Sequence, residues 1–512
     1  MTILEKITSN AMKYPERIMY HLDKGMSEKE EELTWNDLEI FSDKLAAYLD
    51  RTLKGNTPVV VYGHKSPYMI VCFLACVKSG RAYCPVDVSV PLNRVEIIIE
   101  EVNPEIILST ECLETHYKNV LYLDSICSII ENESGVIEKE KQVQAEDIFY
   151  IIFTSGSTGN PKGVQITRDC LDNFVKWARS LDNNRLQKEK HYTFINQAPF
   201  SFDLSVMDLY LTLYTGGTLW ALDKERQSDM KLLLESLEKS QANVWVSTPS
   251  FVDVCLSDKK FSNIILPKLE MFLFCGEILS NRTVNRLQIA FPDSSIINTY
   301  GPTESTVAIT EISITSEINN KYNPLPIGKE KEGTWVSIVD ESGKDVPDGE
   351  KGEIVIIGNT VSIGYWKNTE RTNKVFGIKD INGKLYRCYH TGDKGYRKDG
   401  FLFYCGRIDL QVKLHGYRIE IEDIENNLMK IPYIRQAVVL PNYRGEQVKS
   451  IIAYVVTRER VDDSFEYSQK IRFELKQYLP EYMIPKKIVF LEQLPMTNNG
   501  KVDRKILGGI KE

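Results

Sequence analysis

The amino-acid sequence predicts a mixed α/β and α+β protein. We expect a large N-terminal domain of layered α/β sheets with a β-rich subdomain, followed by a small C-terminal α+β domain. Two observations lead to this prediction. The chain has 512 residues, more than one hydrophobic core usually organises. Apolar strand-like runs alternate with helical patterns along most of it, and the pattern changes to a compact set of short strands and helices near the C-terminus.

The elements of the expected first domain begin with a strand at residues 58–63 (PVVVYG) and a helix at 68–78. Short apolar strands follow at 244–246 and 271–274, each ending in turn residues, so we expect at least one mainly parallel sheet. The runs 352–358 (GEIVIIG) and 401–407 (FLFYCGR) are separated by Gly, Asn and Asp, which indicates a more antiparallel β region.

The sequence pattern changes after Arg407. Ile421, Ile424 and Leu428 share one helical face, and they are followed by expected strands at 437–440 and 451–456, a helix at 468–478 and a strand at 488–491. About one hundred residues are enough for a separate domain. We therefore expect a large domain over residues 1–408 and a small one over 409–512.

Composition places the chain among ordinary folded proteins, with 42% hydrophobic and 26% charged residues. Its 63 Lys and Arg against 71 Asp and Glu give a net charge of −8, which argues against nucleic-acid binding over the whole surface. The longest apolar run, 68–77, is about half of a bilayer span. Residues 1–7 lack the apolar stretch of a secretory signal, so we expect a cytoplasmic protein.

The ten cysteines are scattered, and only Cys72 and Cys76 lie close together. Both fall in the apolar run that predicts a core helix. Buried thiols are therefore favoured over a metal site or a disulfide.

The most informative segment is 148–164 (IFYIIFTSGSTGNPKGV), in which an apolar strand leads into a loop of Gly, Ser and Thr with one Lys. Such a loop lets the backbone approach phosphate oxygens closely and offers hydroxyls and a cation to them. Pro161 and the lack of a Gly-Lys-Ser/Thr ending distinguish it from a Walker A motif. The alternative, a flexible Gly/Ser turn, does not account for so many suitable residues after a buried strand.

This loop resembles the signature of the adenylate-forming superfamily, which includes acyl-CoA synthetases, luciferases and the adenylation domains of nonribosomal peptide synthesis. Four further segments are similar in the same order: 298–304 (NTYGPTE), 389–393 (YHTGD), 406–413 (GRIDLQVK) and 499–503 (NGKVD). The resemblance implies ATP and Mg²⁺ as cofactors. It implies an ATP site made of Thr154, Ser155, Gly156, Ser157, Thr158, Gly159, Lys162, Asn298, Thr299, Tyr300, Gly301, Pro302, Thr303, Asp393, Tyr404, Cys405, Gly406, Arg407 and Lys501.

Within this set, Tyr300 offers a flat face for adenine. Glu304, which directly follows Thr303, suits a hydrated Mg²⁺. The resemblance assigns Asp393, which we expect at a strand end, to the ribose hydroxyls. It also makes Lys501 the catalytic lysine, where a lone terminal lysine would otherwise be a solvated charge. His390 and His415 adjoin these motifs without an evident partner acid, so we interpret both as structural.

The segment 196–206 (NQAPFSFDLSV) indicates the substrate class. In superfamily members that activate amino acids, the aspartate of this segment pairs with the substrate ammonium, and Asp203 matches it. A carboxylate in a pocket is costly unless a cation arrives to pair with it. The alternative interpretation of Asp203 is a helix N-cap or a surface carboxylate.

The resemblance is narrower still to the branch that activates D-alanine and loads it onto a phosphopantetheine carrier protein for (lipo)teichoic acid esterification. It rests on 196–208, 248–251 (TPSF), 272–277 (FLFCGE) and 414–418 (LHGYR). Cys275 and Val307 match positions that line the pocket for the substrate methyl group, and Asp409 matches the hinge of a mobile C-terminal domain. The chain ends eleven residues after Lys501. We therefore expect the carrier to be a separate protein. We also expect the ligase to be a monomer without a membrane span.

Three other functions compete with this hypothesis. The first is a free-standing adenylation enzyme for another small amino acid. The second is a regulatory nucleotide-binding protein without turnover, which the presence of both Glu304 and Lys501 argues against. The third is a fatty acid coenzyme A ligase, which Asp203 argues against because such a substrate has no ammonium.

Overall fold

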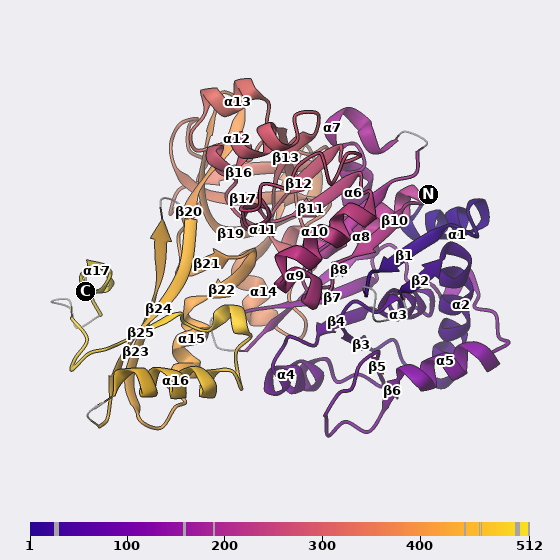
Figure 1. Cartoon of the computed structure of the whole chain (residues 1–512), viewed down its shortest axis with the longest axis horizontal. Helices are drawn as coiled ribbons and strands as arrows, with labels where there is room; N and C mark the ends of the chain where they lie inside the picture. The colour runs from indigo at the N-terminus through magenta and orange to yellow at the C-terminus, as the bar shows by residue number, and fades with distance from the viewer. Residues whose placement is uncertain are drawn as a thin grey trace. The chain divides into compact units, whose positions relative to one another are not determined.

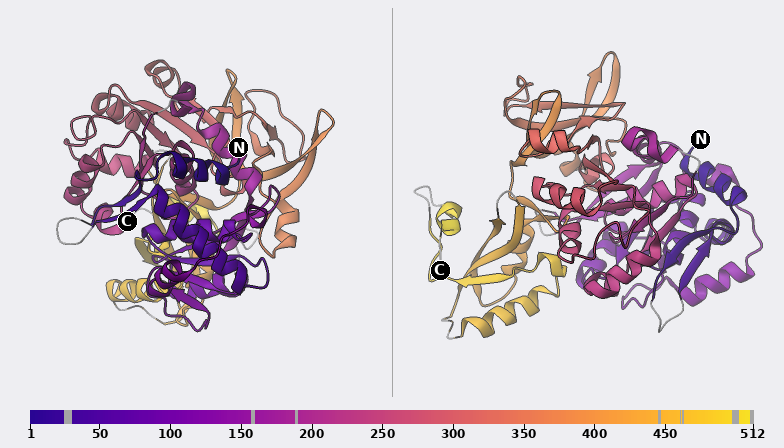
Figure 2. Two further views of the ribbon diagram at one scale, coloured as in Figure 1. Left: turned by 90° about the vertical axis from the view of Figure 1, so that its right-hand side faces the viewer. Right: turned by 45° about the horizontal axis from the view of Figure 1, so that its top comes forward.

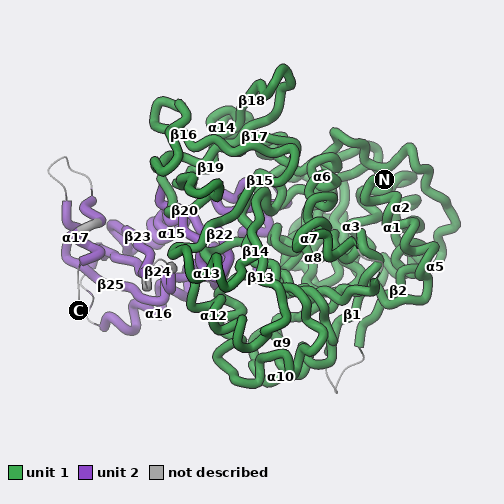
Figure 3. The backbone as a smooth tube through the Cα atoms, turned by 90° about the horizontal axis from the view of Figure 1, so that it is seen from above, with its two compact units in different colours: residues 1–88, 102–153, 163–408 green, residues 89–101, 154–162, 409–512 purple. Residues whose placement is uncertain are grey.

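The structure is a computed structural model that describes residues 1–24, 30–156, 160–187, 190–444, 447–459, 461, 463–496 and 502–509. The chain forms two compact units (Figure 3). Unit 1 comprises Met1–Val88, Val102–Phe153 and Gly163–Ile408, and unit 2 comprises Ser89–Glu101, Thr154–Lys162 and Asp409–Glu512. The sequence pattern divides the chain only between 408 and 409, whereas unit 2 also takes in two short segments from much earlier in the chain.

Unit 1 contains the three larger sheets (Figure 1). The nine-stranded sheet has the order β15-β14-β13-β12-β11-β9-β10-β1-β2. Its six adjacent strands β13, β12, β11, β9, β10 and β1 are parallel to one another. In chain order its strands are β1 (Ile18–Leu22), β2 (Glu31–Thr34), β9 (Thr193–Asn196), β10 (Thr218–Ala221), β11 (Val244–Ser247), β12 (Met271–Phe274), β13 (Ser295–Tyr300), β14 (Thr310–Ser313) and β15 (Lys329–Glu330).

The six-stranded sheet has the order β6-β5-β3-β4-β7-β8 and is parallel from β6 through β7. Its strands are β3 (Val59–Gly63), β4 (Tyr83–Asp87), β5 (Ile107–Ser109), β6 (Val120–Tyr122), β7 (Ile148–Thr154) and β8 (Lys162–Thr167).

The five-stranded sheet is antiparallel and forms the β-rich part of unit 1, drawn in orange in both views of Figure 2. Its strands are β16 (Thr334–Val339), β17 (Gly352–Gly358), β18 (Phe376–Ile381), β19 (Lys384–Lys398) and β20 (Phe401–Arg407).

The helices whose residues lie in unit 1 are α1 (Ile3–Lys13), α2 (Trp35–Thr52), α3 (Pro67–Lys78), α5 (Leu123–Asn132), α6 (Arg168–Ala178), α7 (Leu181–Asn184), α8 (Leu204–Thr215), α9 (Lys224–Ser228), α10 (Met230–Ser240), α11 (Pro249–Cys255), α12 (Asn281–Ala290), α13 (Ser316–Lys321) and α14 (Thr369–Val375). None of the helices in the described part of the chain has the length and apolar character needed to cross a bilayer.

Helices α3 and α8 form the layer between the two larger sheets. Helix α3 packs against β1 and β2 of one sheet and β3 and β4 of the other. It is therefore buried along its whole length, which explains why its sequence is apolar on every side. Cys72 and Cys76 are fully buried, and all ten cysteines, which lie in the described part of the chain, are free.

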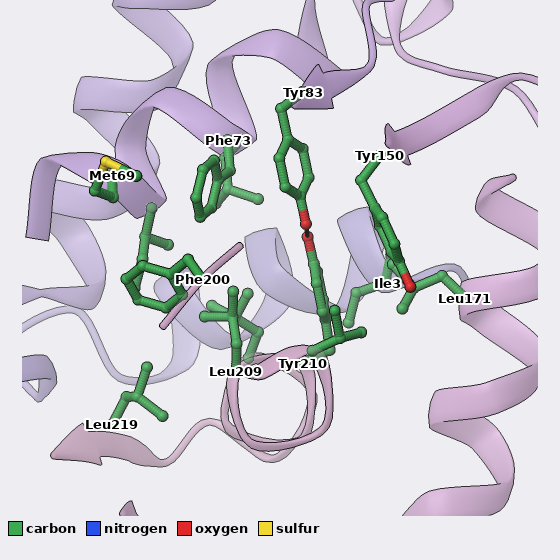
Figure 4. Close-up of a cluster of buried hydrophobic side chains, with 14 of the residues drawn as sticks. Ile3, Met69, Phe73, Tyr83, Tyr150, Leu171, Phe200, Leu209, Tyr210 and Leu219 are labelled. Carbon is green, nitrogen blue, oxygen red and sulfur yellow. Dashed lines mark hydrogen bonds between the residues drawn. The ribbon is translucent and has the colours of Figure 1, made fainter. Parts of the chain in front are cut away.

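The packing of α8 is equally close (Figure 4). It contacts β9, β10 and β11, and its Tyr210 hydroxyl lies 2.8 Å from the hydroxyl of Tyr83 on β4. Both rings are buried, and burial raises the pKa of Tyr83 above its usual range. This hydroxyl pair satisfies two polar groups that would be costly to bury alone.

Unit 2 contains α4 (Leu92–Val102) together with α15 (Ile421–Leu428), α16 (Ser464–Leu475) and α17 (Arg504–Gly509). Its sheets are the pair β21 (Gln411–Leu414) and β22 (Tyr417–Glu420), and the three strands β23 (Ile434–Arg444), β24 (Gln447–Thr457) and β25 (Lys487–Phe490). A buried ion pair joins α4 to α15, since Arg94 Nη1 lies 3.0 Å from Asp423 Oδ2. The fold class predicted from the sequence, mixed α/β and α+β, is confirmed.

The Asp172 side chain on α6 forms a hydrogen bond to the start of α1. We expect the negative charge of this carboxylate to lower the free energy of unfolding. Asp172 Oδ1 accepts a 2.7 Å hydrogen bond from the Ile3 backbone N–H. Burial raises the pKa of Asp172 to about 6 despite this bond and the nearby Arg168. The folded state therefore binds more protons than the unfolded state between about pH 4 and 6, and stability falls as the pH rises through this window.

We expect Asp172→Asn to remove this loss of folding stability at higher pH, because the side chain can no longer ionise. The amide oxygen can still accept the hydrogen bond from the Ile3 backbone N–H. The variant should gain about 1–3 kcal/mol of stability relative to the parent between pH 5 and pH 7.5. Chemical denaturation at both pH values measures the difference. A stability difference that is the same at both pH values would contradict the prediction.

Candidate nucleotide and amino acid site

The candidate site of unit 1 lies where parallel strands of the nine-stranded sheet end. Strands β9, β12 and β13 end at Asn196, Phe274 and Tyr300. The carboxyl ends of parallel strands lie at one edge of a sheet, where α/β proteins bind ligands. The segments that follow β9 and β12 carry Asp203 and Cys275, and the NTYGPTE motif begins within β13 and continues beyond its end.

The loop after β13 is tightly closed. The Ile309 N–H donates to the Tyr300 carbonyl at 2.7 Å, and a Cβ on Gly301 would stand only 2.6 Å from Ala308 Cα. Thr306 and Val307 have φ values of 62° and 67°. β-Branched residues rarely adopt these angles, so the loop holds backbone strain of the kind found at functional sites.

Two residues of this loop connect the expected phosphate segment to its surroundings. The Thr303 hydroxyl donates a 2.6 Å hydrogen bond to Asp203 Oδ2. Asp203 occupies the N-cap position of α8, as the alternative interpretation expects, but its side chain makes no capping hydrogen bond to that helix. Glu304 is fully buried, and its Oε1 accepts a 2.8 Å hydrogen bond from the Tyr365 hydroxyl.

Asp393 lies between a tyrosine and an arginine. Its Oδ2 accepts from the Tyr300 hydroxyl and its Oδ1 from Arg407 Nη1, both at 2.6 Å. The Asp393 and Arg407 side chains are only 2% and 8% exposed. Burial, together with the charge of Asp393, raises the pKa of Tyr300 above its usual range. Arg407 is therefore part of a buried ion pair and not of an exposed one.

The expectation that Asp393 ends a strand is wrong. Asp393 lies inside the 15-residue strand β19, at a shift of register between Asp393 and Gly395 where β19 pairs with β20. The two strands bring Asp393 opposite Arg407. Bulges of this kind redirect side chains next to binding sites. The pattern of apolar and polar residues in a sequence does not distinguish a bulge inside a strand from the end of a strand.

Other expected nucleotide-binding residues lie around Tyr300. The Tyr404 ring centroid is 6.3 Å from that of Tyr300. Asn298 uses its amide nitrogen to donate to the Pro326 carbonyl at 2.9 Å, and the Thr299 hydroxyl donates to the Phe274 carbonyl at 2.8 Å. Both side chains thus hold the loop in place. Cys405, Gly406 and Pro302 lie in the same segments.

The two expected pocket residues are in contact with each other. Cys275 and Val307 are 3% and 2% exposed, and the Cys275 thiol lies 3.7 Å from the Val307 carbonyl oxygen. The end of β12 and the strained loop after β13 are therefore in contact at these two residues.

The described part of the expected phosphate loop belongs to unit 2. The Ser155 hydroxyl donates to the Arg418 carbonyl at 2.8 Å and accepts from the Glu420 N–H at 3.3 Å. The buried Thr154 hydroxyl has no hydrogen-bond partner among the described residues, and such a group suits a ligand oxygen. Gly156 follows, and Lys162 begins β8 and is 5% exposed.

Several expected residues lie outside the described residues: Ser157, Thr158, Gly159 and Lys501. Asp409 is described. It begins the long C-terminal segment of unit 2, and its Oδ1 accepts a 3.1 Å hydrogen bond from the Gln411 N–H.

Two buried or half-buried side chains have partners that no sequence motif indicates: Tyr365 for Glu304 and Glu353 for His390. His390 Nδ1 lies 3.0 Å from Glu353 Oε2, across β17 and β19. Both partners lie dozens of residues away in the chain, and no local pattern pairs them. The expectation that His390 lacks a partner acid is therefore wrong.

Comparison with known proteins identifies the family. The model for AMP-binding enzymes matches residues 7–366, and the model for the AMP-binding enzyme C-terminal domain matches residues 423–501. Two curated relatives are named D-alanine–D-alanyl carrier protein ligase. The relative from Bacillus cereus is 45% identical over 512 residues and that from Bacillus licheniformis 44% identical over 517 residues, each covering 99% of both chains.

Among solved structures, a holo nonribosomal peptide synthetase protein with adenylation and carrier domains has a TM-score of 0.82 and is 26% identical. The match covers 99% of this chain and 84% of that chain. Two of the five sequence motifs, at 298–304 and 148–164, lie within residues 7–366, the first matched region. These motifs include Thr303 and Ser155, whose hydrogen bonds are described above. The two curated relatives described above are D-alanine–D-alanyl carrier protein ligases, and the chain belongs to the AMP-binding enzyme family.

Proposed function

We propose that this protein is a D-alanine–D-alanyl carrier protein ligase. It activates D-alanine with ATP to D-alanyl-AMP, releases pyrophosphate, and transfers the D-alanyl group to the phosphopantetheine thiol of a separate carrier protein, with release of AMP. The product serves the D-alanylation of (lipo)teichoic acid. We further propose that the enzyme works as a monomer in the cytoplasm.

The observation that carries this proposal is the hydrogen bond between Thr303 and Asp203. Asp203 is the carboxylate proposed to bind the substrate ammonium, and Thr303 belongs to the segment proposed to bind phosphate. A substrate whose ammonium pairs with Asp203 would therefore present its carboxylate close to the α-phosphate, as an in-line attack requires.

The first half-reaction needs no protein nucleophile. A substrate carboxylate oxygen bonds to the α-phosphorus while the bond from that phosphorus to the pyrophosphate oxygen breaks. The leaving pyrophosphate takes the electron pair. Positioning and neutralisation of charge account for catalysis of this type. We assign Asp393 and Arg407 to the ribose and phosphate, Tyr300 and Tyr404 to adenine, and Lys501 to the charge that develops between carboxylate and phosphate.

Glu304 is the residue proposed to hold Mg²⁺. Magnesium usually binds proteins through one or two carboxylates plus the substrate phosphates, and a buried Glu304 held by Tyr365 in the phosphate segment fits that donor set. When bound, the ion would offset the negative charge of the triphosphate. Tyr365 keeps the carboxylate in one orientation by donating its hydroxyl proton to Oε1.

In the second half-reaction the carrier thiol sulfur bonds to the acyl carbon as the acyl C–O bond to AMP breaks, and the thiol proton is lost. We propose two domains, 1–408 and 409–512, with Asp409 as the hinge. The movement of the small domain would bring Lys501 to the site for the first half-reaction and withdraw it for the second.

The pocket of Cys275 and Val307 is proposed to accept the methyl group of D-alanine. The thiol is small and buried beside the Val307 backbone, and this close contact supports acceptance of a methyl group in preference to a larger side chain. Replacement of the thiol should change the preference between the two enantiomers.

We expect ATP–pyrophosphate exchange to be strongest with D-alanine in a panel of D- and L-amino acids and one fatty acid. The preference for D- over L-alanine should shift in Cys275→Ala, and an unchanged ratio would exclude the proposed role of the thiol. Exchange strongest with another amino acid would contradict the assignment to D-alanine. Absence of exchange with every acid would instead indicate a binding protein.

A further inference from the structure

A buried lysine outside the proposed catalytic residues contacts the segment that carries Asp203. Lys65 follows β3 of the six-stranded sheet and is 2% exposed. Its ammonium donates hydrogen bonds to Asn196 Oδ1, at the end of β9 in the nine-stranded sheet, and to the Ala198 carbonyl at 2.5 Å. Lys65, next to the six-stranded sheet, thus holds the last residue of β9 in the nine-stranded sheet and a residue two positions beyond it.

The same contacts extend to helix α8. Asn196 Nδ2 donates a 2.9 Å hydrogen bond to Asp208 Oδ1, so Lys65 reaches Asp208 through the Asn196 amide. Asp208 is fully buried, and its Oδ2 has no hydrogen-bond partner among the described residues. We call Lys65, Asn196, Ala198 and Asp208 the Lys65 network.

The Lys65 network encloses the turn that bears Asp203. Ala198 lies five residues before Asp203 and Asp208 five residues after it. Between them the Phe202 N–H donates to the Pro199 carbonyl at 2.9 Å, and the Phe200 ring lies below the Lys65 ammonium, 4.8 Å from its centroid. Figure 4 shows Phe200 facing Phe73 of α3, with ring centroids 5.5 Å apart.

Burying such an ammonium is costly for the fold. Loss of hydration lowers the pKa of Lys65 to about 8, although the negative charge of Asp208 acts in the opposite direction. Its direct hydrogen-bond acceptors are a neutral amide and a backbone carbonyl, which stabilise a charge less well than a carboxylate does. If position 65 served packing alone, an apolar residue would do so at a lower free-energy cost. The lysine at this position therefore indicates a role for its hydrogen bonds, which fix the positions of Asn196 and Ala198.

We propose that Lys65 is a positioning residue for the amino acid substrate. By fixing Asn196, Ala198 and, through Asn196, the start of α8, it holds the turn so that the Asp203 carboxylate meets the substrate ammonium. This inference rests on the proposed role of Asp203. In this proposal Lys65 acts through these residues and not by direct contact with a substrate.

We expect Lys65→Met to raise the KM for D-alanine in pyrophosphate exchange at least about tenfold, while the KM for ATP changes less than about twofold. A misplaced carboxylate weakens binding of the ammonium but leaves the nucleotide contacts unchanged. Burial raises the pKa of Asp208 well above its usual range, and the nearby Lys65 charge opposes this rise. Because the single variant removes that opposing charge from a buried carboxyl group, Lys65→Met with Asp208→Asn is the second test variant. Both are compared with the parent after thermal melting has shown that they are folded.

Lys78→Met is the matched control. Lys78 is a second buried lysine, 1% exposed, and it bonds to Glu39 and Asp43 on α2 instead of to the Asp203 segment. We expect this control to lower the melting temperature without changing either KM.

The two KM values decide the outcome. A folded Lys65 variant with both KM values unchanged, or with both raised equally, would overturn the positioning role. Failure of the proposed function itself gives a different result, because the parent enzyme would then show no exchange with D-alanine.

Discussion

Replacing Asp393 with alanine is expected to reduce kcat/KM for ATP in pyrophosphate exchange at least about a hundredfold. The carboxylate accepts from Tyr300 and Arg407, so it orders both groups around the proposed ribose and adenine positions. Each hydrogen bond to a charged group contributes about 1.5–3 kcal/mol, and about 2.7 kcal/mol corresponds to a hundredfold change. Loss of one carboxylate removes two such bonds and the proposed ribose contact.

Stability must be measured together with activity. Asp393→Ala leaves the buried Arg407 guanidinium without this partner, and breaking a buried ion pair costs about 3–5 kcal/mol. Asp393→Asn retains an oxygen that can accept from Tyr300 and should show a smaller loss of stability. Assays at a temperature well below the melting transition of each variant separate the two effects.

Glu330→Ala is the control for Asp393→Ala. Glu330 forms an ion pair with Arg397, on the same long strand β19 and four residues beyond Asp393, with Arg397 Nη2 2.5 Å from Glu330 Oε1. We expect this variant to melt at a lower temperature with an unchanged KM for ATP. A folded Asp393→Ala enzyme with a normal KM for ATP would exclude the proposed ribose-binding role.

Local patterns located some of the strands and helices of the fold. Apolar runs with flanking turn residues predicted β12 (Met271–Phe274), β17 (Gly352–Gly358) and β20 (Phe401–Arg407) with these bounds. β12 is buried throughout and β17 almost throughout, which explains their continuous apolar sequence. The helix expected at 468–478 instead spans Ser464–Leu475, because Asp463 caps it by accepting from Phe465 N and Glu466 N.

Long-range contacts could not be predicted in the same way. Arg94 and Asp423 form a buried ion pair although more than three hundred residues separate them, and this contact helps to explain why residues 89–101 belong to unit 2. The pairing depends on which surfaces meet after folding. A charged residue in a sequence looks the same whether its partner is distant or absent.

The candidate site could be predicted only in part, because the partners of its residues are distant in the chain. Motifs identified the residues that lie after strand ends, but not their partners: Tyr365 for Glu304, Thr303 for Asp203, and Lys65 for the Asp203 segment. Lys65 in particular sits in an unremarkable GHKS sequence. Its importance depends on burial between two sheets, which only the folded chain reveals.

Replacing Lys501 with alanine is expected to reduce formation of D-alanyl-AMP at least about a hundredfold to a thousandfold. Removal of one group that stabilises charge in a transition state typically has an effect of this size. By contrast, transfer from preformed D-alanyl-AMP to the carrier thiol should change less than about threefold, because the proposed mechanism withdraws Lys501 before that step. Pyrophosphate exchange measures the first half-reaction and carrier acylation measures the second.

The comparison between the two half-reactions tests the proposed mechanism more sharply than the loss of activity alone. Lys476→Ala replaces an exposed lysine of unit 2 whose ammonium lies 3.8 Å from Glu481, and it should leave both half-reactions unchanged. A Lys501→Ala enzyme that loses both half-reactions equally would show that the lysine is needed throughout, or that the variant is misfolded, which thermal melting distinguishes. In the first case two alternating domain positions would no longer be needed, because one fixed arrangement would serve both steps.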